Sequence, residues 1–196
     1  MQNRTKLSES ELQIINCGII EEPMRVLQTT EESDLKLLRV NCKELIPEDE
    51  NLKLLISRMY QTVRDENKPG VGIAAPQVGI ARRLFIAQRM DKKDNPFEFF
   101  INPEIVWFSN IKRRGEEGCL SIPDAYGDVY RSLTIQITYY DMSGTHFQEV
   151  VEGFTAVIMQ HEMDHLNGVL FTDRMEEQAE IEYYNASPTG EIVYPR

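Results

Sequence analysis

The sequence lacks long apolar runs and contains little histidine, cysteine or tryptophan. Its 196 residues include three histidines, three cysteines and one tryptophan. No segment approaches the roughly 20 consecutive apolar residues that a membrane-spanning helix needs, so we expect no membrane association. The first ten residues, MQNRTKLSES, lack the apolar stretch of a secretory signal. We therefore expect a cytoplasmic protein; an organellar origin, or an export segment removed before this N-terminus, stays open.

The cysteines are too few, and odd in number, for a disulfide framework. Cys17, Cys42 and Cys119 instead fit a reducing compartment, where thiols remain available for metal binding or for chemistry. The mixed polar and apolar segment around Cys42 favours a buried structural thiol, and we interpret Cys17 in the same way.

Positive charge is scarce relative to negative charge. Lys and Arg total 21 residues and Asp and Glu total 32, which gives a formal net charge of −11. A surface this acidic repels phosphate backbones, so we expect no direct nucleic-acid binding. Hydrophobic residues make up 41% of the chain and charged residues 27%, as in an ordinary globular protein. The length predicts one domain, or one domain with appendages. We expect a monomer.

Two segments have the apolar periodicity of one-sided helices. The first runs from about Pro47 to Glu66, where Lys68-Pro69-Gly70 stops it. The second runs from about Gly153 to Asn167, with Gly168 as its stop.

Several segments read as strands. Short strands are predicted at residues 83–87, 99–103, 105–108 and 145–151, and the longest at residues 129–139. In the longest strand the apolar residues share one parity, on which Arg131 also falls. A charge that faces a core needs a partner. We expect Asp164, on the second helix, to be that partner.

One pentapeptide has the spacing of a metal site. His161-Glu162-Met163-Asp164-His165 is an H-E-x-x-H sequence on the second predicted helix. Residues four apart lie above one another on a helix, so His161 and His165 can bind one metal ion. Glu162 lies about 100° round the axis, close enough to move protons without being a ligand. Because two of the three histidines fall in this pentapeptide, we favour metal binding over a pair of core histidines.

Two histidines leave a catalytic site one protein ligand short of the usual three. His146, in a predicted hairpin, is one candidate; it could also complete a closed structural zinc site. A downstream glutamate would instead make the chain a zinc endopeptidase, and the available residues are Glu176, Glu177 and Glu180. Cys119, in Glu117-Gly118-Cys119-Leu120-Ser121, is the stronger candidate, because thiolate is a strong ligand for divalent transition metals.

Three segments together resemble a known family. Residues 70–77 read GVGIAAPQ, residues 117–121 read EGCLS and residues 160–165 read QHEMDH. In this order and spacing they resemble the three signature motifs of peptide deformylases. The resemblance implies an α+β fold, with antiparallel strands packed around a central helix that carries the H-E-x-x-H motif. It also implies an enzyme of the bacterial cytoplasm that removes the formyl group from the N-terminal methionine of newly synthesised polypeptides.

The same resemblance divides the chain into three parts and implies residue roles. An irregular N-terminal extension (1–20) precedes a peptide deformylase-like catalytic domain (21–175), and an acidic C-terminal tail (176–196) follows it. The implied metal ligands are Cys119, His161 and His165, with hydroxide attacking from the fourth position. The implied catalytic groups are Glu162 as general base and acid, with the Gln77 side chain and the Leu120 backbone N–H facing the oxyanion. The implied substrate-binding residues are Val71, Gly72, Gly118, Phe154, Val157 and Ile158.

The resemblance also implies a cofactor and a substrate. One divalent ion binds each chain, natively Fe²⁺, which Zn²⁺, Ni²⁺ or Co²⁺ can replace. The substrates are the N-formylmethionyl peptides of nascent chains. Some bacterial relatives dock on the ribosome through a basic C-terminal helix. The acidic tail of this chain argues against such docking.

Overall fold

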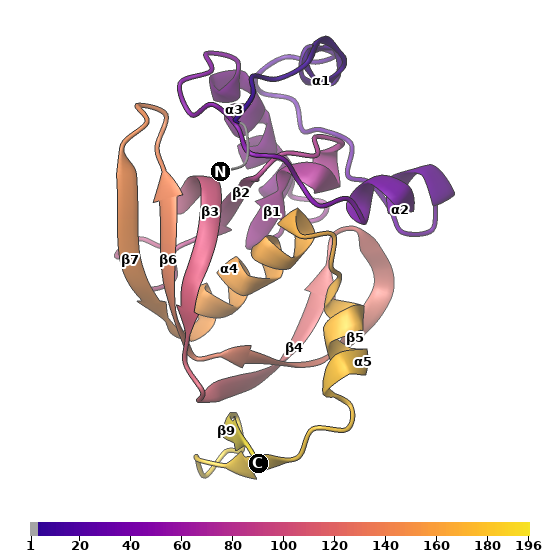
Figure 1. Ribbon diagram of the computed structural model, residues 1–196. Helices are drawn as coiled ribbons and strands as arrows, with labels where there is room; N and C mark the ends of the chain where they lie inside the picture. Colours follow the sequence, from indigo (N-terminus) through magenta and orange to yellow (C-terminus); the bar gives the residue numbers. More distant parts are fainter. Residues whose placement is uncertain (1–3) are drawn as a thin grey trace.

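Two antiparallel sheets form the framework of the fold (Figure 1). The structure, a computed structural model, describes residues 4–196. The larger sheet contains, in spatial order, β1 (Gly72–Ala74), β2 (Leu84–Gln88), β3 (Phe97–Phe108), β6 (Thr134–Tyr140) and β7 (His146–Glu152). The smaller sheet contains, in spatial order, β5 (Ile122–Ser132), β4 (Lys112–Cys119), β9 (Ile192–Pro195) and β8 (Tyr183–Asn185).

Within residues 4–196, five α-helices and one short 3-10 helix accompany these sheets. They are α1 (Glu9–Ile15), α2 (Glu32–Leu38), α3 (Leu52–Val63), η1 (Ala75–Val78), α4 (Gly153–Leu166) and α5 (Phe171–Gln178). The combination of antiparallel sheets and helices confirms the predicted α+β class. None of the helices within residues 4–196 is long and apolar enough to cross a membrane.

Helix α4 lies between the two sheets (Figure 1). It contacts β1 and β2 of the larger sheet and β5 of the smaller one. Most of its residues from Thr155 to Leu166 are buried, as expected of a helix with protein on all sides. Gly168 ends it with φ +72°, and a Cβ there would lie 2.4 Å from the Arg39 carbonyl oxygen, so only glycine fits.

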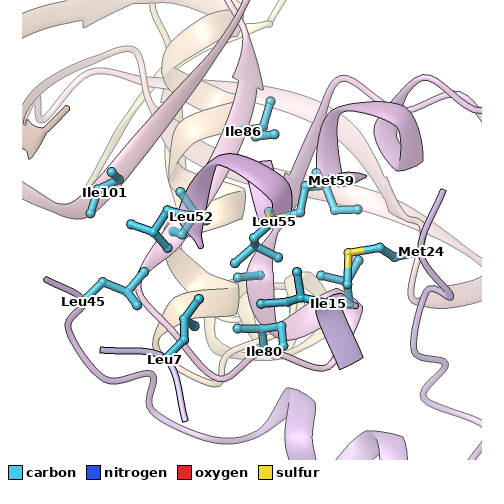
Figure 2. Close-up of a cluster of buried hydrophobic side chains, with 14 of the residues drawn as sticks. Leu7, Ile15, Met24, Leu45, Leu52, Leu55, Met59, Ile80, Ile86 and Ile101 are labelled. Carbon is cyan, nitrogen blue, oxygen red and sulfur yellow. The ribbon is translucent and has the colours of Figure 1, made fainter. Parts of the chain in front are cut away.

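The N-terminal segment is part of the core, which corrects the expectation of an irregular extension. Residues 1–3 lie outside the described part of the chain, but residues 9–15 form α1. Ser8 and Glu11 cap this helix reciprocally, and Leu7 and Ile15 are buried in the cluster of apolar side chains around α3 (Figure 2). A seven-residue helix is too short to show clear periodicity and is stabilised by such packing.

The predicted strand at residues 129–139 is two strands, and this prediction was wrong. The chain passes from β5 in the smaller sheet to β6 in the larger one at Leu133. The Leu133 N–H donates to Ile111, and its carbonyl accepts from Gly153, outside both ladders. Both strands keep the same alternation across this step, so the parity of the side chains does not reveal the break.

Other boundaries also differ from the predictions. Strand β3 is continuous where two pieces were expected, because register shifts between Ile101 and Trp107 accommodate Pro103. Helix α3 begins at Leu52, five residues after Pro47. The acidic C-terminal tail continues after α5 as the β8–β9 hairpin. Residues 187–190 form the turn of this hairpin, and β9 pairs with β4.

Candidate metal and active site

Three side chains that could hold a metal ion converge from two distant segments. His161 and His165 lie on α4 with ring centroids 5.0 Å apart. Cys119 is the last residue of β4, and its Sγ lies 3.2 Å from His165 Nε2. The donor atoms of the three residues all lie within 4.8 Å of one another. One thiolate and two imidazoles form a donor set that suits a divalent transition metal.

The alternative third ligands do not join this group within residues 4–196. His146 is exposed at the start of β7, where its ring lies against Tyr140. The acidic alternatives all have exposed side chains on or just after α5; they are Glu176, Glu177 and Glu180. Among residues 4–196, Cys119 is therefore the only predicted third ligand whose donor atom lies within 4.8 Å of donor atoms of both histidines.

The environment of Cys119 favours the thiolate. Burial alone would raise the pKa of its thiol, but the neighbouring His165 and His161 hold the pKa well below the ordinary value. The Ser121 N–H and the Gln77 side-chain amide also donate to Sγ, at 3.4 Å and 3.5 Å. Cys42, by contrast, is buried among apolar groups, and burial raises the pKa of its thiol to about 12.

Alkylation should separate these thiols. In metal-free protein we expect iodoacetamide to modify Cys119 faster than Cys42, because the thiolate is the nucleophile. Cys17 is exposed, so the expectation of a buried thiol there was wrong. Loading with a divalent metal should protect Cys119 and leave Cys17 as reactive as before. Peptide mass spectrometry after timed labelling measures all three rates. Equal labelling of Cys119 with and without metal would contradict its assignment as a ligand.

Glu162 points into the same site and is 3% exposed. Among the described residues its Oε2 has no hydrogen-bond partner. Burial raises the pKa of this carboxyl to about 7, against the opposing effect of His161 and His165. A Cβ on Gly72 would lie 2.3 Å from Glu162 Oε1, so the glycine makes room for the carboxylate. A buried carboxyl near neutrality beside a metal site can take and return a proton.

Gln77 is oriented by its own backbone surroundings on η1. The Ala74 N–H donates to Gln77 Oε1 at 2.8 Å, which fixes which end of the amide is free. The Nε2 end therefore faces Cys119 and Ser121, and it donates to Ser121 Oγ at 3.2 Å. The amide is a buried N–H donor held against the Cys119 sulfur.

A buried ion-pair network contacts the Nδ1 atom of His161. His161 Nδ1 lies 2.9 Å from Glu117 Oε2, and Arg131 donates to both Glu117 oxygens at 2.8 Å and 2.9 Å. Arg131 also donates to Asp164 at 2.5 Å, which confirms the predicted partner. Burial raises the pKa of Glu117, but Arg131 and His161 outweigh burial and lower it to about 2. Carboxylates that orient a ligand histidine in this way are common in metal sites.

Glu117 was not predicted to be a functional residue. The available signal was its position two residues before Cys119, which in a strand places both side chains on one face. Ser121 was also missed; it is fully buried and accepts the hydrogen bond from Gln77.

A cavity of about 340 Å³ opens onto this site. Its lining contains every predicted site residue except His165, which is buried behind it: Val71, Gly72, Gln77, Gly118, Cys119, Leu120, Phe154, Val157, Ile158, His161 and Glu162. Tyr126 and Glu116 also line the cavity and were not predicted. The structure therefore brings together residues from three separated segments of the sequence.

Known proteins share both the sequence and the fold. A family model described as polypeptide deformylase matches residues 23–180. A peptide deformylase from Synechocystis sp. is 42% identical over 142 residues, which cover 72% of this chain and 75% of that protein. The crystal structure of peptide deformylase from Thermotoga maritima is similar with a TM-score of 0.69 and 38% identity, covering 78% of this chain and 97% of that chain.

A second solved structure carries a bound peptide. It is the Met-Ala-Ser complex of class I type b peptide deformylase from Acinetobacter baumannii, similar with a TM-score of 0.69 and 36% identity. The similarity covers 79% of this chain and 99% of that chain. Because the family model matches residues 23–180, which include the whole of the site, the chain belongs to the peptide deformylase family, whose members are hydrolases that remove the formyl group from the N-terminus of polypeptides.

Proposed function

We propose that this chain deformylates nascent polypeptides with a metal ion held by Cys119, His161 and His165. The observation that carries the proposal is the convergence of these three donors beside a buried, unpaired carboxyl of Glu162. In this proposal α4 is the central helix that carries the H-E-x-x-H motif. Residues 21–175 form the catalytic unit, and the segments on either side support it.

The protein groups have separate roles in the proposed reaction. When bound, the divalent ion supplies a Lewis acid that makes water a nucleophile at neutral pH. Glu162 accepts the proton of the attacking water and later donates a proton to the leaving amine. The Gln77 Nε2 and the Leu120 backbone N–H donate to the oxygen on which negative charge develops. Gln77 is suited to this role because Ala74 holds its amide in one orientation.

The proposed substrates are N-formylmethionyl peptides. The relative from A. baumannii was solved with Met-Ala-Ser bound, which supports a methionine-led peptide as the ligand class. Val71, Gly72 and Gly118 line the cavity and would pair with the substrate backbone. The apolar side chains proposed to contact the methionine are Phe154, Val157 and Ile158.

The native ion in this proposal is Fe²⁺, with Zn²⁺, Ni²⁺ or Co²⁺ able to take its place. A site with one thiolate and two imidazoles accepts all four ions, so the donor set alone does not select among them. We further propose that the protein acts as a monomer in the bacterial cytoplasm, where nascent chains are made, and that it does not bind nucleic acid directly.

Purification without oxygen followed by metal analysis tests the function. We expect about one divalent ion per chain and release of formate from N-formylmethionyl peptides. Protein loaded with Ni²⁺ should keep its activity in air longer than protein loaded with Fe²⁺, because iron beside a thiolate promotes oxidation of Cys119. A fully loaded protein that releases no formate would refute the proposal.

The Cys119→Ala variant separates this function from a zinc endopeptidase with a glutamate ligand. A deformylase that uses the thiolate should lose both metal and activity in this variant. An endopeptidase that uses Glu176, Glu177 or Glu180 should keep its metal. Cys42→Ala is the matched control, since this buried thiol lies outside the cavity and should leave the metal content unchanged.

A further inference from the structure

A line of alternating charges connects His161 to helix α5. His161 contacts Glu117, Glu117 pairs with Arg131, and Arg131 pairs with Asp164. Asp164 then accepts from Arg174, which belongs to α5. The Arg174 Nη2 lies 2.6 Å from Asp164 Oδ1, and its Nε lies 3.1 Å from Asp164 Oδ2. The line therefore ends in a two-point contact from a helix that supplies no metal ligand.

Asp164 depends on both arginines for its position. It is buried, and its Oδ2 accepts from Arg131 while Arg174 contacts both of its oxygens. Removing Arg174 would leave one carboxylate oxygen of a buried group without a strong donor. The carboxylate would then turn toward its remaining partner, Arg131, and change the geometry with which Arg131 holds Glu117.

Helix α5 has its own attachments, which fix where Arg174 stands. Asp173 pairs with Arg39 just after α2, and Gln178 exchanges hydrogen bonds with the backbone of Tyr130 on β5 at 2.9 Å and 3.0 Å. These contacts hold α5 against the rest of the fold without involving Asp164. They provide a way to loosen the helix without touching the line of charges.

We propose that Arg174 is a positioning residue for the metal site, which acts on His161 through Asp164, Arg131 and Glu117. The inference rests on the proposed ligand set. According to this proposal, helix α5 helps to hold the metal. Loss of a residue that orients a ligand histidine commonly lowers metal affinity about 10- to 100-fold. The competing interpretation is that Arg174 only fastens α5 to α4, in which case its loss lowers stability and leaves the metal site unchanged.

The test compares Arg174→Ala with Arg174→Lys, Arg39→Ala and the parent protein. Each protein is loaded with Co²⁺ without oxygen, and its absorption spectrum and its rate of metal loss to an excess of chelator are measured. We expect Arg174→Ala to lose the ion at least about 10-fold faster than the parent and to alter the Co²⁺ spectrum. Arg174→Lys should fall between them, because an ammonium keeps the charge and one contact but not the two-point geometry. Arg39→Ala should match the parent in both measurements.

Each result decides between the interpretations. Parent-like metal loss and spectrum in Arg174→Ala, with only a lower unfolding temperature, would overturn the inference and leave the deformylase proposal intact. Equal effects of Arg39→Ala and Arg174→Ala would also overturn it, since they would show a general loosening of α5. A parent that retains no Co²⁺ would refute the ligand set itself. If Arg174→Ala does not fold, the order of metal loss among the parent, Arg174→Lys and Arg174→Gln serves as the test.

Discussion

Replacing Glu162 with glutamine is expected to reduce formate release by about 100- to 10,000-fold while the metal stays bound. Glutamine has nearly the same shape as the carboxylate but cannot accept and return a proton at neutral pH. The proposed metal donors, Cys119, His161 and His165, are unchanged in this variant, so the ion should remain. The side chain is 3% exposed, which limits how far solvent can replace the missing base.

The measurement pairs steady-state formate release with metal content of the same Ni²⁺-loaded sample. Glu152→Gln is the control, because Glu152 is exposed and precedes α4 at its N-terminus, outside the cavity. It should keep activity within about twofold. A Glu162→Gln protein with full metal and parent-like turnover would show that another group moves the proton.

The second large effect is expected on stability. Arg131→Met keeps most of the side-chain volume but removes a cation that pairs with Glu117 and Asp164. Arg131 is 5% exposed, and breaking a buried pair from one side commonly costs about 3–5 kcal/mol. His161 and Arg174 still contact the two carboxylates, so we expect about 3 kcal/mol, the lower end of that range.

Urea unfolding of the metal-free proteins measures this loss without a contribution from the ion. Arg114→Met is the matched control on the same pair of strands, because Arg114 pairs with Asp128 at the surface. An exposed pair of this kind contributes less than about 1 kcal/mol. A loss from Arg131→Met no greater than that from Arg114→Met would mean that the buried network adds little to the fold.

The sequence was most informative where chemistry constrains spacing. Apolar periodicity predicted the helix over about residues 153–167. The four-residue spacing of His161 and His165 on it then pointed to one ion. Arg131 was informative for a similar reason, because a charge on an apolar parity needs a partner and Asp164 provides one. The role of Glu117 was not predicted, because a carboxylate in a short polar strand is not by itself unusual and does not call for a partner.

The sequence was least informative where tertiary contacts determine which strands pair and which short elements form. The step at Leu133 from one sheet to the other leaves the alternation of side chains unchanged, so only the pairing partners reveal it. Helix α1 is too short to hold by itself and depends on burial of Leu7 and Ile15. The β8–β9 hairpin consists of two very short strands, and its place beside β4 follows from pairing with a segment about 80 residues earlier.

The placement of the proposed ligands has a consequence beyond catalysis. Cys119 belongs to the end of β4, whereas His165, 46 residues later, belongs to α4. An ion bound to both is a removable cross-link that closes this long loop. Because it binds the native arrangement in preference to the unfolded chain, it stabilises the fold by an amount that grows with the logarithm of the free-ion concentration once that concentration exceeds the dissociation constant. Depriving a cell of the ion would therefore shorten the lifetime of the folded protein as well as remove its activity.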